Sequence, residues 1–284
     1  MSRRLLAVHA HPDDETLTMA ATLAGAVVAG AQVTLVTATL GEEGEVIGDE
    51  LRGLVAEHAD QLGGYRLAEL RAACKALGVK DSRMLGGAGA FRDSGMLGPQ
   101  PADVPRVFTR AAPGGPDHQR VVQMLGRMIN VSRPDVLLTY DADGGYGHPD
   151  HVAVHQVAVA AAAQAGWPTP RVLAVIRPRT VTTAAFDAFP VPRGCLRAAA
   201  GDVWSLSDDS VVAVAVPVAG VERARRRALA AHATQVTLIP GGFALSNRIA
   251  QPLPDTEYYR LLAGDPPPRR LDGSPADDVF AGLS

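Results

Sequence analysis

Cysteine is scarce in this chain, which holds only Cys74 and Cys195 among its 284 residues. One lies in a helical pattern and the other in a loop-like stretch, so the two thiols cannot build a disulfide framework or a cysteine-based zinc site. The low cysteine content fits a reducing, cytoplasmic compartment.

Long apolar runs are absent as well. No stretch reaches the roughly 18 uninterrupted apolar residues that a membrane helix needs. Arg3 and Arg4 precede "LLAVHA", which superficially resembles the start of a signal peptide, but this run ends at a histidine and is soon followed by acids. We therefore interpret it as a strand and expect no membrane partner.

Charge is modest and dispersed. The formal net charge is −3, and the basic residues are scattered apart from Arg225 to Arg227. A nucleic-acid-binding surface needs a basic patch or stripe, so no nucleic-acid partner is expected. The three arginines lie in an expected helix and are typical of a solvated helix face. With 47% hydrophobic residues, the chain has the composition of a globular protein with a large core.

Short runs rich in β-branched residues alternate with segments of helical length. The expected strands are 5–10, 32–40, 82–85, 135–140, 171–176 and 211–216, and the expected helices are 14–29, 66–77, 119–131, 150–165 and 221–233. This alternation predicts an α/β fold, with a mostly parallel sheet covered by helices on both faces. We expect one domain over residues 1–262, irregular from about residue 177.

Two segments interrupt this pattern. Residues 86–116 are rich in glycine and proline and too long for an ordinary loop, which predicts a lid or binding loop, with a tolerated surface insertion as the alternative. Residues 263–284 are Pro-rich and are predicted to be a poorly ordered tail.

Histidines gather after two of the expected strands. His9 and His11 end the first strand, and His148, His151 and His155 follow the strand that ends at residue 140. Ligands of open α/β sheets bind at the carboxyl ends of strands, where the strand order reverses. A strand order of 3-2-1-4-5 would make these two strands neighbours and bring the two histidine clusters together.

The motifs "HPDDE" and "HPDH" supply metal-ligand types at this point. His11 and Asp14 flank one turn, and His151 stands at the start of the later helix. Two histidines and one aspartate leave coordination positions for water, as in catalytic zinc sites, and ferrous iron accepts the same set. Acids at a helix start also stabilise the helix by themselves, but that explains neither His11 nor the second motif.

Other arrangements are less consistent with the sequence. His9 and His11 would share one strand face, as at the start of amidohydrolase-like barrels, but such a barrel needs eight strand–helix units and further histidines. We therefore expect His9 to be buried behind the site. A dinucleotide-binding fold lacks support, because no glycine fingerprint follows the first strand and its acids would repel a pyrophosphate.

"AHPDDE" and "GHPDH" together resemble the LmbE/PIG-L family of metal-dependent N-acetylglucosaminide deacetylases. The longer blocks "TLGEEGEVIGD", "HADQLGGYRLAEL", "LGGAGAFRDSGM", "TYDADGGYGHPDHV" and "ALAAHATQV" extend the resemblance from residue 4 to about 250. They resemble members that act on N-acetylglucosaminyl-inositol in mycothiol biosynthesis.

The resemblance implies a Rossmann-like fold, one Zn²⁺ or Fe²⁺ ion per subunit, and hydrolysis of the acetamide of this small pseudodisaccharide to acetate and an amine. It is compatible with a homo-oligomer. Alternatives are a mycothiol S-conjugate amidase, a deacetylase of a natural-product amino sugar, or a non-catalytic sugar-binding protein on the same fold.

The resemblance also assigns roles to individual residues. The metal ligands would be His11, Asp14 and His151, and the general base would be Asp13. Tyr146 would donate to the oxyanion, His148 would act as an acid or electrostatic partner near the leaving amine, and Asp150 would orient a histidine. Arg66, Asp93 and Glu45 would bind the sugar and inositol hydroxyls, whereas His155 is expected to be packed.

Overall fold

A computed structural model describes residues 2–96, 105–199, 202–203 and 205–283 of the chain. Its main sheet has eight strands in the order β3-β2-β1-β4-β5-β11-β7, with β6 paired to β5. The strands are β1 (Arg4–His9), β2 (Gln32–Thr37), β3 (Asp81–Met84), β4 (Val136–Tyr140), β5 (Arg171–Pro178), β6 (Leu206–Ser207), β7 (Val214–Pro217) and β11 (Thr256–Gly264).

Strands β1 to β5 are parallel, and β11 runs antiparallel to both of its neighbours. The predicted α/β class and the predicted order of the first five strands are confirmed. β1 and β4 are adjacent, with Leu5 opposite Val136 and Ala7 opposite Leu138.

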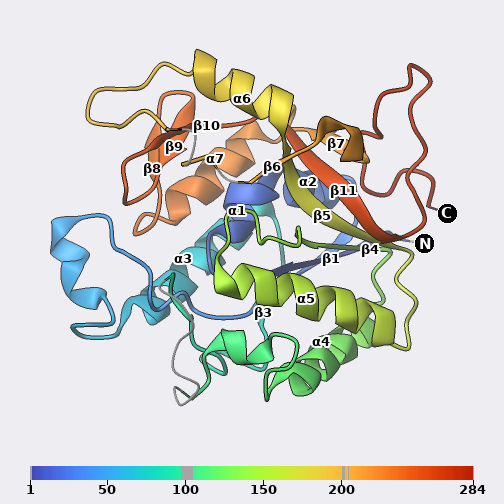
Figure 1. Ribbon diagram of the computed structural model, residues 1–284, viewed down its shortest axis with the longest axis horizontal. Coiled ribbons are helices and arrows are strands. Elements are labelled where there is room, and N and C mark those ends of the chain that lie inside the picture. Colours follow the sequence, from blue (N-terminus) through green and yellow to red (C-terminus); the bar gives the residue numbers. More distant parts are fainter. Residues whose placement is uncertain (1, 97–104, 200–201, 204, 284) are drawn as a thin grey trace.

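Helices cover both faces of this sheet (Figure 1). They are α1 (Asp14–Thr18), α2 (Ala20–Val28), α3 (Leu62–Leu77), α4 (His118–Ser132), α5 (Pro149–Gln164), α6 (Arg179–Ala188) and α7 (Glu222–Ala231). Side chains alternate along β1, so Leu5 and Ala7 pack with α2, α3 and α7, whereas Leu6 and Val8 pack with α4 and α5. No helix among the described residues is long and apolar enough to cross a membrane.

The expected single helix over residues 14–29 is broken at Met19, where φ is −137°. The cause lies far away in the sequence. The buried carboxylate of Glu257, on β11, accepts hydrogen bonds from the backbone N–H groups of Ala21 and Thr22, both at 2.8 Å. This side chain satisfies the first amides of α2 and allows a new helix to begin there.

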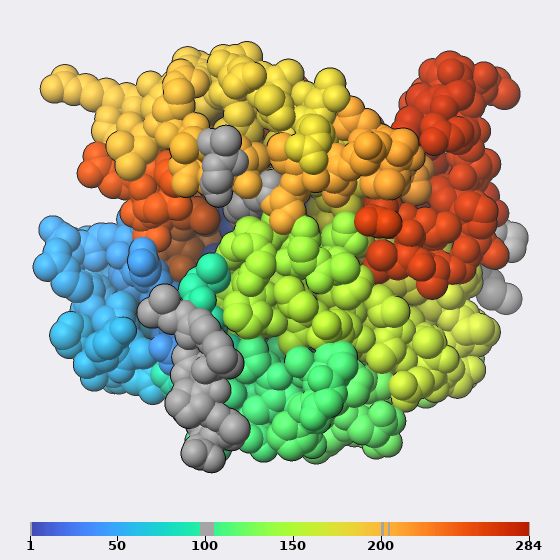
Figure 2. Space-filling view, viewed as in Figure 1, coloured from blue at the N-terminus to red at the C-terminus, as the bar shows by residue number. Residues whose placement is uncertain are grey.

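The chain beyond β5 contains elements that the sequence pattern did not reveal. They are α6, β11 and a three-stranded antiparallel sheet of β8 (Thr237–Ile239), β9 (Gly242–Ala244) and β10 (Ala250–Pro252). In Figure 2, the orange region that contains β8 to β10 lies beside the blue segment around residues 41–60. A hydrogen bond from Ile47 N–H to the Thr234 carbonyl, at 2.9 Å, joins the two regions.

The described part of the tail is packed, which differs from the expected poorly ordered segment. Ala276, Val279 and Phe280 are buried in the core on the β7 side. The buried Arg171 donates to the Val279 carbonyl at 2.7 Å. Apolar residues beyond the proline run therefore tie the tail to the sheet, where Figure 2 shows it in red.

Candidate active site

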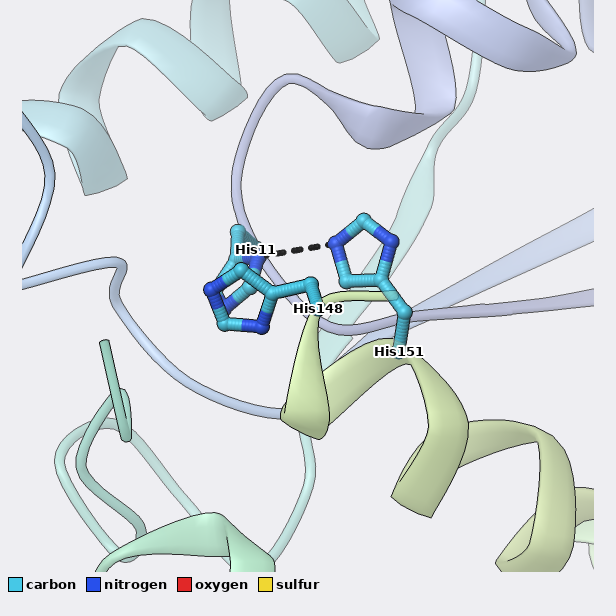
Figure 3. Close-up of side chains that lie close together, drawn as sticks. All are labelled: His11, His148 and His151. Atoms are coloured by element: carbon cyan, nitrogen blue, oxygen red, sulfur yellow. Dashed lines mark hydrogen bonds between the residues drawn. The ribbon is translucent and has the colours of Figure 1, made fainter. Parts of the chain in front are cut away.

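The carboxyl ends of β1 and β4 bring the two sequence motifs together. His11 lies in the turn after β1, while His148 and His151 stand at the N-terminus of α5 (Figure 3). All three imidazoles are buried and point toward one another. The adjacency of two parallel strands therefore builds one cluster from segments far apart in sequence.

Three donor side chains form a closed triangle in this cluster. His11 Nδ1 lies 3.1 Å from His151 Nε2, which lies 3.4 Å from Asp14 Oδ1, and Asp14 Oδ2 lies 3.6 Å from His11 Nδ1. A tetrahedral ion with bonds of about 2.0–2.1 Å requires donor atoms separated by roughly 3.3 Å. The side chains therefore fit a cation of this size.

The remaining atoms of these residues are held by neighbours. His151 Nδ1 lies 3.0 Å from the Gly144 carbonyl and donates to it, which leaves Nε2 as the atom with a lone pair. His11 Nε2 lies 3.3 Å from Asp150 Oδ2 and the same distance from Asp93 Oδ1. A carboxylate or carbonyl behind a histidine is the usual support of a metal ligand.

Tyr140 supports two sides of the triangle, a role that sequence reasoning missed. Its hydroxyl donates to Asp14 Oδ2 at 2.6 Å, and its ring stacks on His151 with centroids 4.2 Å apart. The same hydroxyl accepts the N–H of Ala10 at 2.8 Å. In the sequence, only its position at the end of β4 indicated a place near the site. Its contacts with Asp14 and His151 arise only in the folded chain.

Two further combinations of side chains in the cluster could hold a metal ion: His148 with His11 and His151, and Asp93 with Asp150 and His11. His148 Nδ1, however, accepts the N–H of Asp150 at 3.1 Å. A neutral imidazole that accepts at Nδ1 carries its proton on Nε2, the atom facing Asp93. This arrangement makes His148 a hydrogen-bond donor toward the site.

Asp13 stands at the N-cap position of α1 but does not cap it. Its side chain makes no capping hydrogen bond within the described structure, and its φ of 118° lies in the left-handed region. Its Oδ2 accepts from Arg66 Nη2 at 3.0 Å, and its carbonyl accepts from the amides of Thr16 and Leu17. The helix start therefore uses the backbone of Asp13 and leaves its carboxylate to Arg66.

The buried charges of the cluster favour the presence of a positive charge among its side chains. Burial raises the pKa of Asp13 to about 7, although Arg66 opposes this shift. Burial also opposes the charge of Asp14, but His151 and His11 lower its pKa below the usual range. Burial would lower the pKa of His11, yet Asp93 and Asp150 raise it well above its ordinary value. The buried carboxylates thus attract a proton or a metal ion to this point.

Part of the cluster, including His11, Asp14 and His148, lines a cavity of about 870 Å³. Tyr146 contributes its ring, 4.9 Å from that of His151 between centroids, and its side chain is 36% exposed. Acids on the described wall outnumber cations, since Arg66 is the one lysine or arginine there. The described lining residues outside the cluster include Glu43, Glu45, Glu57, Asp202, Ser205, Gln235, Ser246, Asn247 and Gln251.

The expected sugar-binding residues all reach this cavity but differ in their surroundings. Glu45 is exposed on its wall. Arg66 is buried and donates to Gly41 O at 2.8 Å and to Pro12 O at 2.5 Å, besides Asp13. Asp93 is buried against His11, and its backbone N–H donates to Glu42 Oε2 at 3.1 Å, a contact that sequence reasoning missed.

The Gly/Pro-rich segment 86–116 contributes Asp93, Gly95 and Met96 to the cavity wall. Ser94 N–H also donates to Asp150 Oδ2 at 2.9 Å, which joins this segment to α5. The central part of the expected lid, residues 97–104, lies outside the described residues.

The two remaining histidines of the motifs lie outside the donor triangle. His9 is fully buried and its ring meets that of Tyr140 edge-on, with centroids 5.6 Å apart. The Nδ1 atom of His155 lies 2.8 Å from the carbonyl oxygen of Tyr140, and the residue is half-buried. The structure places both as expected, His9 behind the site and His155 in packing.

A family model described as PIG-L, GlcNAc-PI de-N-acetylase, matches residues 6–162. The chain belongs to the PIG-L family. The match includes both histidine motifs and ends within α5.

Curated relatives match nearly the whole chain. A protein of Nakamurella multipartita is 68% identical over 99% of this chain and 96% of its own length. A protein of Mycolicibacterium smegmatis is 47% identical over 99% of this chain and 97% of its own. Both are named 1D-myo-inositol 2-acetamido-2-deoxy-alpha-D-glucopyranoside deacetylase.

Solved structures agree on the fold. A deacetylase of teicoplanin biosynthesis has a TM-score of 0.55 at 23% identity, covering 90% of this chain and 97% of that one. The 4-carboxy-2-hydroxymuconate hydratase of Pseudomonas putida has a TM-score of 0.56 at 16% identity, covering 94% and 99%. Because a deacetylase and a hydratase share this fold, the fold alone does not select the reaction.

Proposed function

We propose that this chain hydrolyses the acetamide of 1D-myo-inositol 2-acetamido-2-deoxy-α-D-glucopyranoside to acetate and the free amine, a step of mycothiol biosynthesis. One observation carries the proposal: Asp13, a buried carboxylate, lines the same large cavity as His11 and Asp14, two corners of the donor triangle that the buried His151 completes. The names of relatives at 68% and 47% identity support the choice of substrate.

His11, Asp14 and His151 would hold the ion, and we propose zinc, with ferrous iron as the alternative that accepts the same ligands. When bound, such an ion polarises a carbonyl and makes a water molecule more acidic. Elemental analysis of anaerobically purified protein, matched to the activity of the same sample, tests which ion is present.

Asp13 would act as the general base. Its carboxylate accepts the proton of the attacking water and then returns it to the leaving amine. A pKa raised by burial to about 7 suits a group that both accepts and releases a proton at neutral pH. Arg66 holds the carboxylate in place through the hydrogen bond to Oδ2.

His148 and Tyr146 would stabilise negative charge on the former carbonyl oxygen. Burial, together with the neighbouring His11, lowers the pKa of His148 to about 3, so the ring is neutral at physiological pH. Its Nε2–H then acts as a hydrogen-bond donor and not as a proton source. Desolvation of its hydroxyl in the cavity wall, with Asp14 nearby, raises the pKa of Tyr146 well above its ordinary value, which keeps the phenol protonated as a second donor.

Asp150 would orient the cluster from behind. Its Oδ2 faces His11 Nε2 and accepts from Ser94 N–H, while its own N–H binds His148 Nδ1. One residue therefore fixes the proton positions of two histidines.

Asp93 and Glu45 would accept hydrogen bonds from substrate hydroxyls, since both line the cavity. The guanidinium of Arg66 already donates hydrogen bonds to Asp13, Gly41 and Pro12. Its contribution to substrate binding would therefore be steric, as part of the cavity wall.

Incubation of the pure protein with two substrates tests the proposal. We expect acetate release from N-acetylglucosaminyl-inositol and slower cleavage of a mycothiol S-conjugate. Preferential cleavage of the conjugate would instead assign the amidase activity, and sugar binding without acetate release would leave a binding protein.

A further inference from the structure

Glu15 and His232 form a buried pair directly behind the proposed base. His232 Nε2 lies 2.7 Å from Glu15 Oε1, and neither residue has any exposed surface. The other oxygen, Glu15 Oε2, accepts the backbone N–H of Asp13 at 3.0 Å. The pair thus contacts the backbone of Asp13 and leaves its carboxylate free to face the cavity.

The backbone of Asp13 needs such support. Its φ of 118° is unfavourable for a residue with a side chain, and a conformation of this kind persists only where the surroundings over-determine it. Glu15 binds the N–H of Asp13, the amides of Thr16 and Leu17 bind its carbonyl, and Arg66 binds its carboxylate. Of these contacts, only the one with Glu15 extends to the C-terminal part of the chain.

We propose that Glu15 and His232 are positioning residues for the deacetylation: they hold Asp13 in its left-handed conformation, which keeps its carboxylate against Arg66 and in the cavity. The inference rests on the proposed role of Asp13 as the base. Asp14 is anchored separately by the Tyr140 hydroxyl and the N–H of His11. Loss of the pair should therefore displace the base without releasing the metal ligand beside it.

His232 gives the C-terminal part of the chain a role in the site. It is the C-cap residue that directly follows α7, beyond the residues 6–162 that the family model covers. Two residues later, Thr234 donates to Glu69 on α3, through N–H at 2.9 Å and through its hydroxyl at 2.7 Å. These two hydrogen bonds fix the turn after α7 to α3.

Glu69 offers a matched control for Glu15. Both are buried glutamates that anchor the turn after α7, but Glu69 accepts hydrogen bonds from Thr234, whereas Glu15 accepts the N–H of Asp13. Glu15→Met and Glu69→Met each remove two buried acceptor oxygens at similar side-chain length. Glu15→Gln retains one oxygen for the N–H of Asp13 and an amide that can donate to His232.

We expect kcat of Glu15→Met to fall about 10- to 100-fold, because small displacements of a catalytic group cost this much, while KM and metal content stay unchanged. Glu15→Gln should recover most of the loss. Glu69→Met should lower the thermal midpoint as Glu15→Met does, yet keep wild-type kcat. If Glu15→Met does not fold, His232→Leu serves in its place, with a loss of kcat at full metal content expected.

Equal kcat in Glu15→Met and wild type, or equal losses of kcat in Glu15→Met and Glu69→Met, would overturn the inference. Asp13→Asn separates this result from failure of the proposed function. An inactive Asp13→Asn beside a fully active Glu15→Met refutes only the positioning role, whereas wild-type protein that releases no acetate refutes both.

Discussion

His11 Nδ1 and His151 Nε2 lie 3.1 Å apart, although 140 residues separate them in the chain. One residue follows β1 and the other opens α5, after β4. The parallel pairing of β1 with β4 places the ends of both strands at one edge of the sheet. The position of the site is therefore a consequence of strand order, as is usual where the order of an open sheet reverses.

Removal of one corner of the triangle should abolish metal binding. In His151→Ala, His11 and Asp14 remain as two ligands, too few for a stable zinc site. We expect metal content well below one ion per chain by elemental analysis, with acetate release lost in parallel. His58→Ala, which changes an exposed histidine outside the cavity, should retain both. Full metal content in His151→Ala would show that another group, such as Asp93 and Asp150 with His11, holds the ion.

Loss of the proposed base should separate chemistry from metal binding. Asp13→Asn keeps the size of the side chain but cannot accept the proton of water, so we expect turnover to fall by about 10² to 10⁴. Metal content should stay at the wild-type level, since the proposed ligands in the donor triangle do not include this residue. Turnover within the error of the wild-type value would exclude a base role for Asp13.

Gly41 leaves space for the guanidinium that holds Asp13. A Cβ at this position would lie 2.5 Å from Arg66 Cζ, and its φ of +66° already favours glycine. We expect Gly41→Ala to displace Arg66 and to reduce acetate release several-fold, roughly the effect of losing one charge-assisted hydrogen bond. The rate of acetate release at equal metal content measures this effect.

Gly30→Ala is the control for backbone strain, because its φ is +84° and no atom lies within 4 Å of the added Cβ. Gly30→Ala should lower the stability of the protein and leave acetate release unchanged. A Gly41→Ala protein as active as Gly30→Ala would contradict the proposed fixing of Asp13 by Arg66.

The two thiols should differ in reactivity with pH. Burial, with Glu15 nearby, raises the pKa of Cys74 to about 12, and the side chain is buried in the core. At pH 8 its thiolate fraction is then about one in ten thousand, so the native protein should titrate one thiol with an aromatic disulfide reagent. Denatured protein should titrate two. A Cys195→Ser variant that still reacts rapidly when folded would contradict the burial of Cys74.

Local sequence patterns were sufficient for the N-terminal half of the fold. Strands 1 to 5 are short runs with β-branched residues between helical segments, and parallel connections of this kind restrict the order in which they assemble. The break at Met19 could not be predicted, because the carboxylate that stabilises it belongs to Glu257, 236 residues from Ala21. The small sheet β8-β9-β10 consists of strands only three residues long, too short for periodicity to register.

In the site too, some residues could be predicted from local motifs and others could not. His11, Asp14 and His151 could be proposed from motifs because ligand type and spacing are local properties, and their role as metal ligands stays a prediction. The contributions of Tyr140 and His232 depend on contacts across 126 and 217 residues, with Asp14 and Glu15 respectively. No local pattern in a single sequence records such contacts, so these supports emerge only from the folded chain.

Glu257 should stabilise the fold without affecting the chemistry. Its carboxylate accepts from the N–H groups of Ala21 and Thr22 and from the Thr22 hydroxyl, at 2.7–2.8 Å, and lies away from the donor triangle. Glu257→Ala leaves these buried donors unsatisfied, so we expect the free energy of unfolding in urea to fall by about 1–3 kcal/mol. Glu50→Ala, at an exposed position, should leave the free energy of unfolding unchanged. Since α2 contributes no residue to the cavity wall, folded Glu257→Ala should bind metal as the wild type does. An unchanged unfolding midpoint would mean that the start of α2 needs no acceptor from β11.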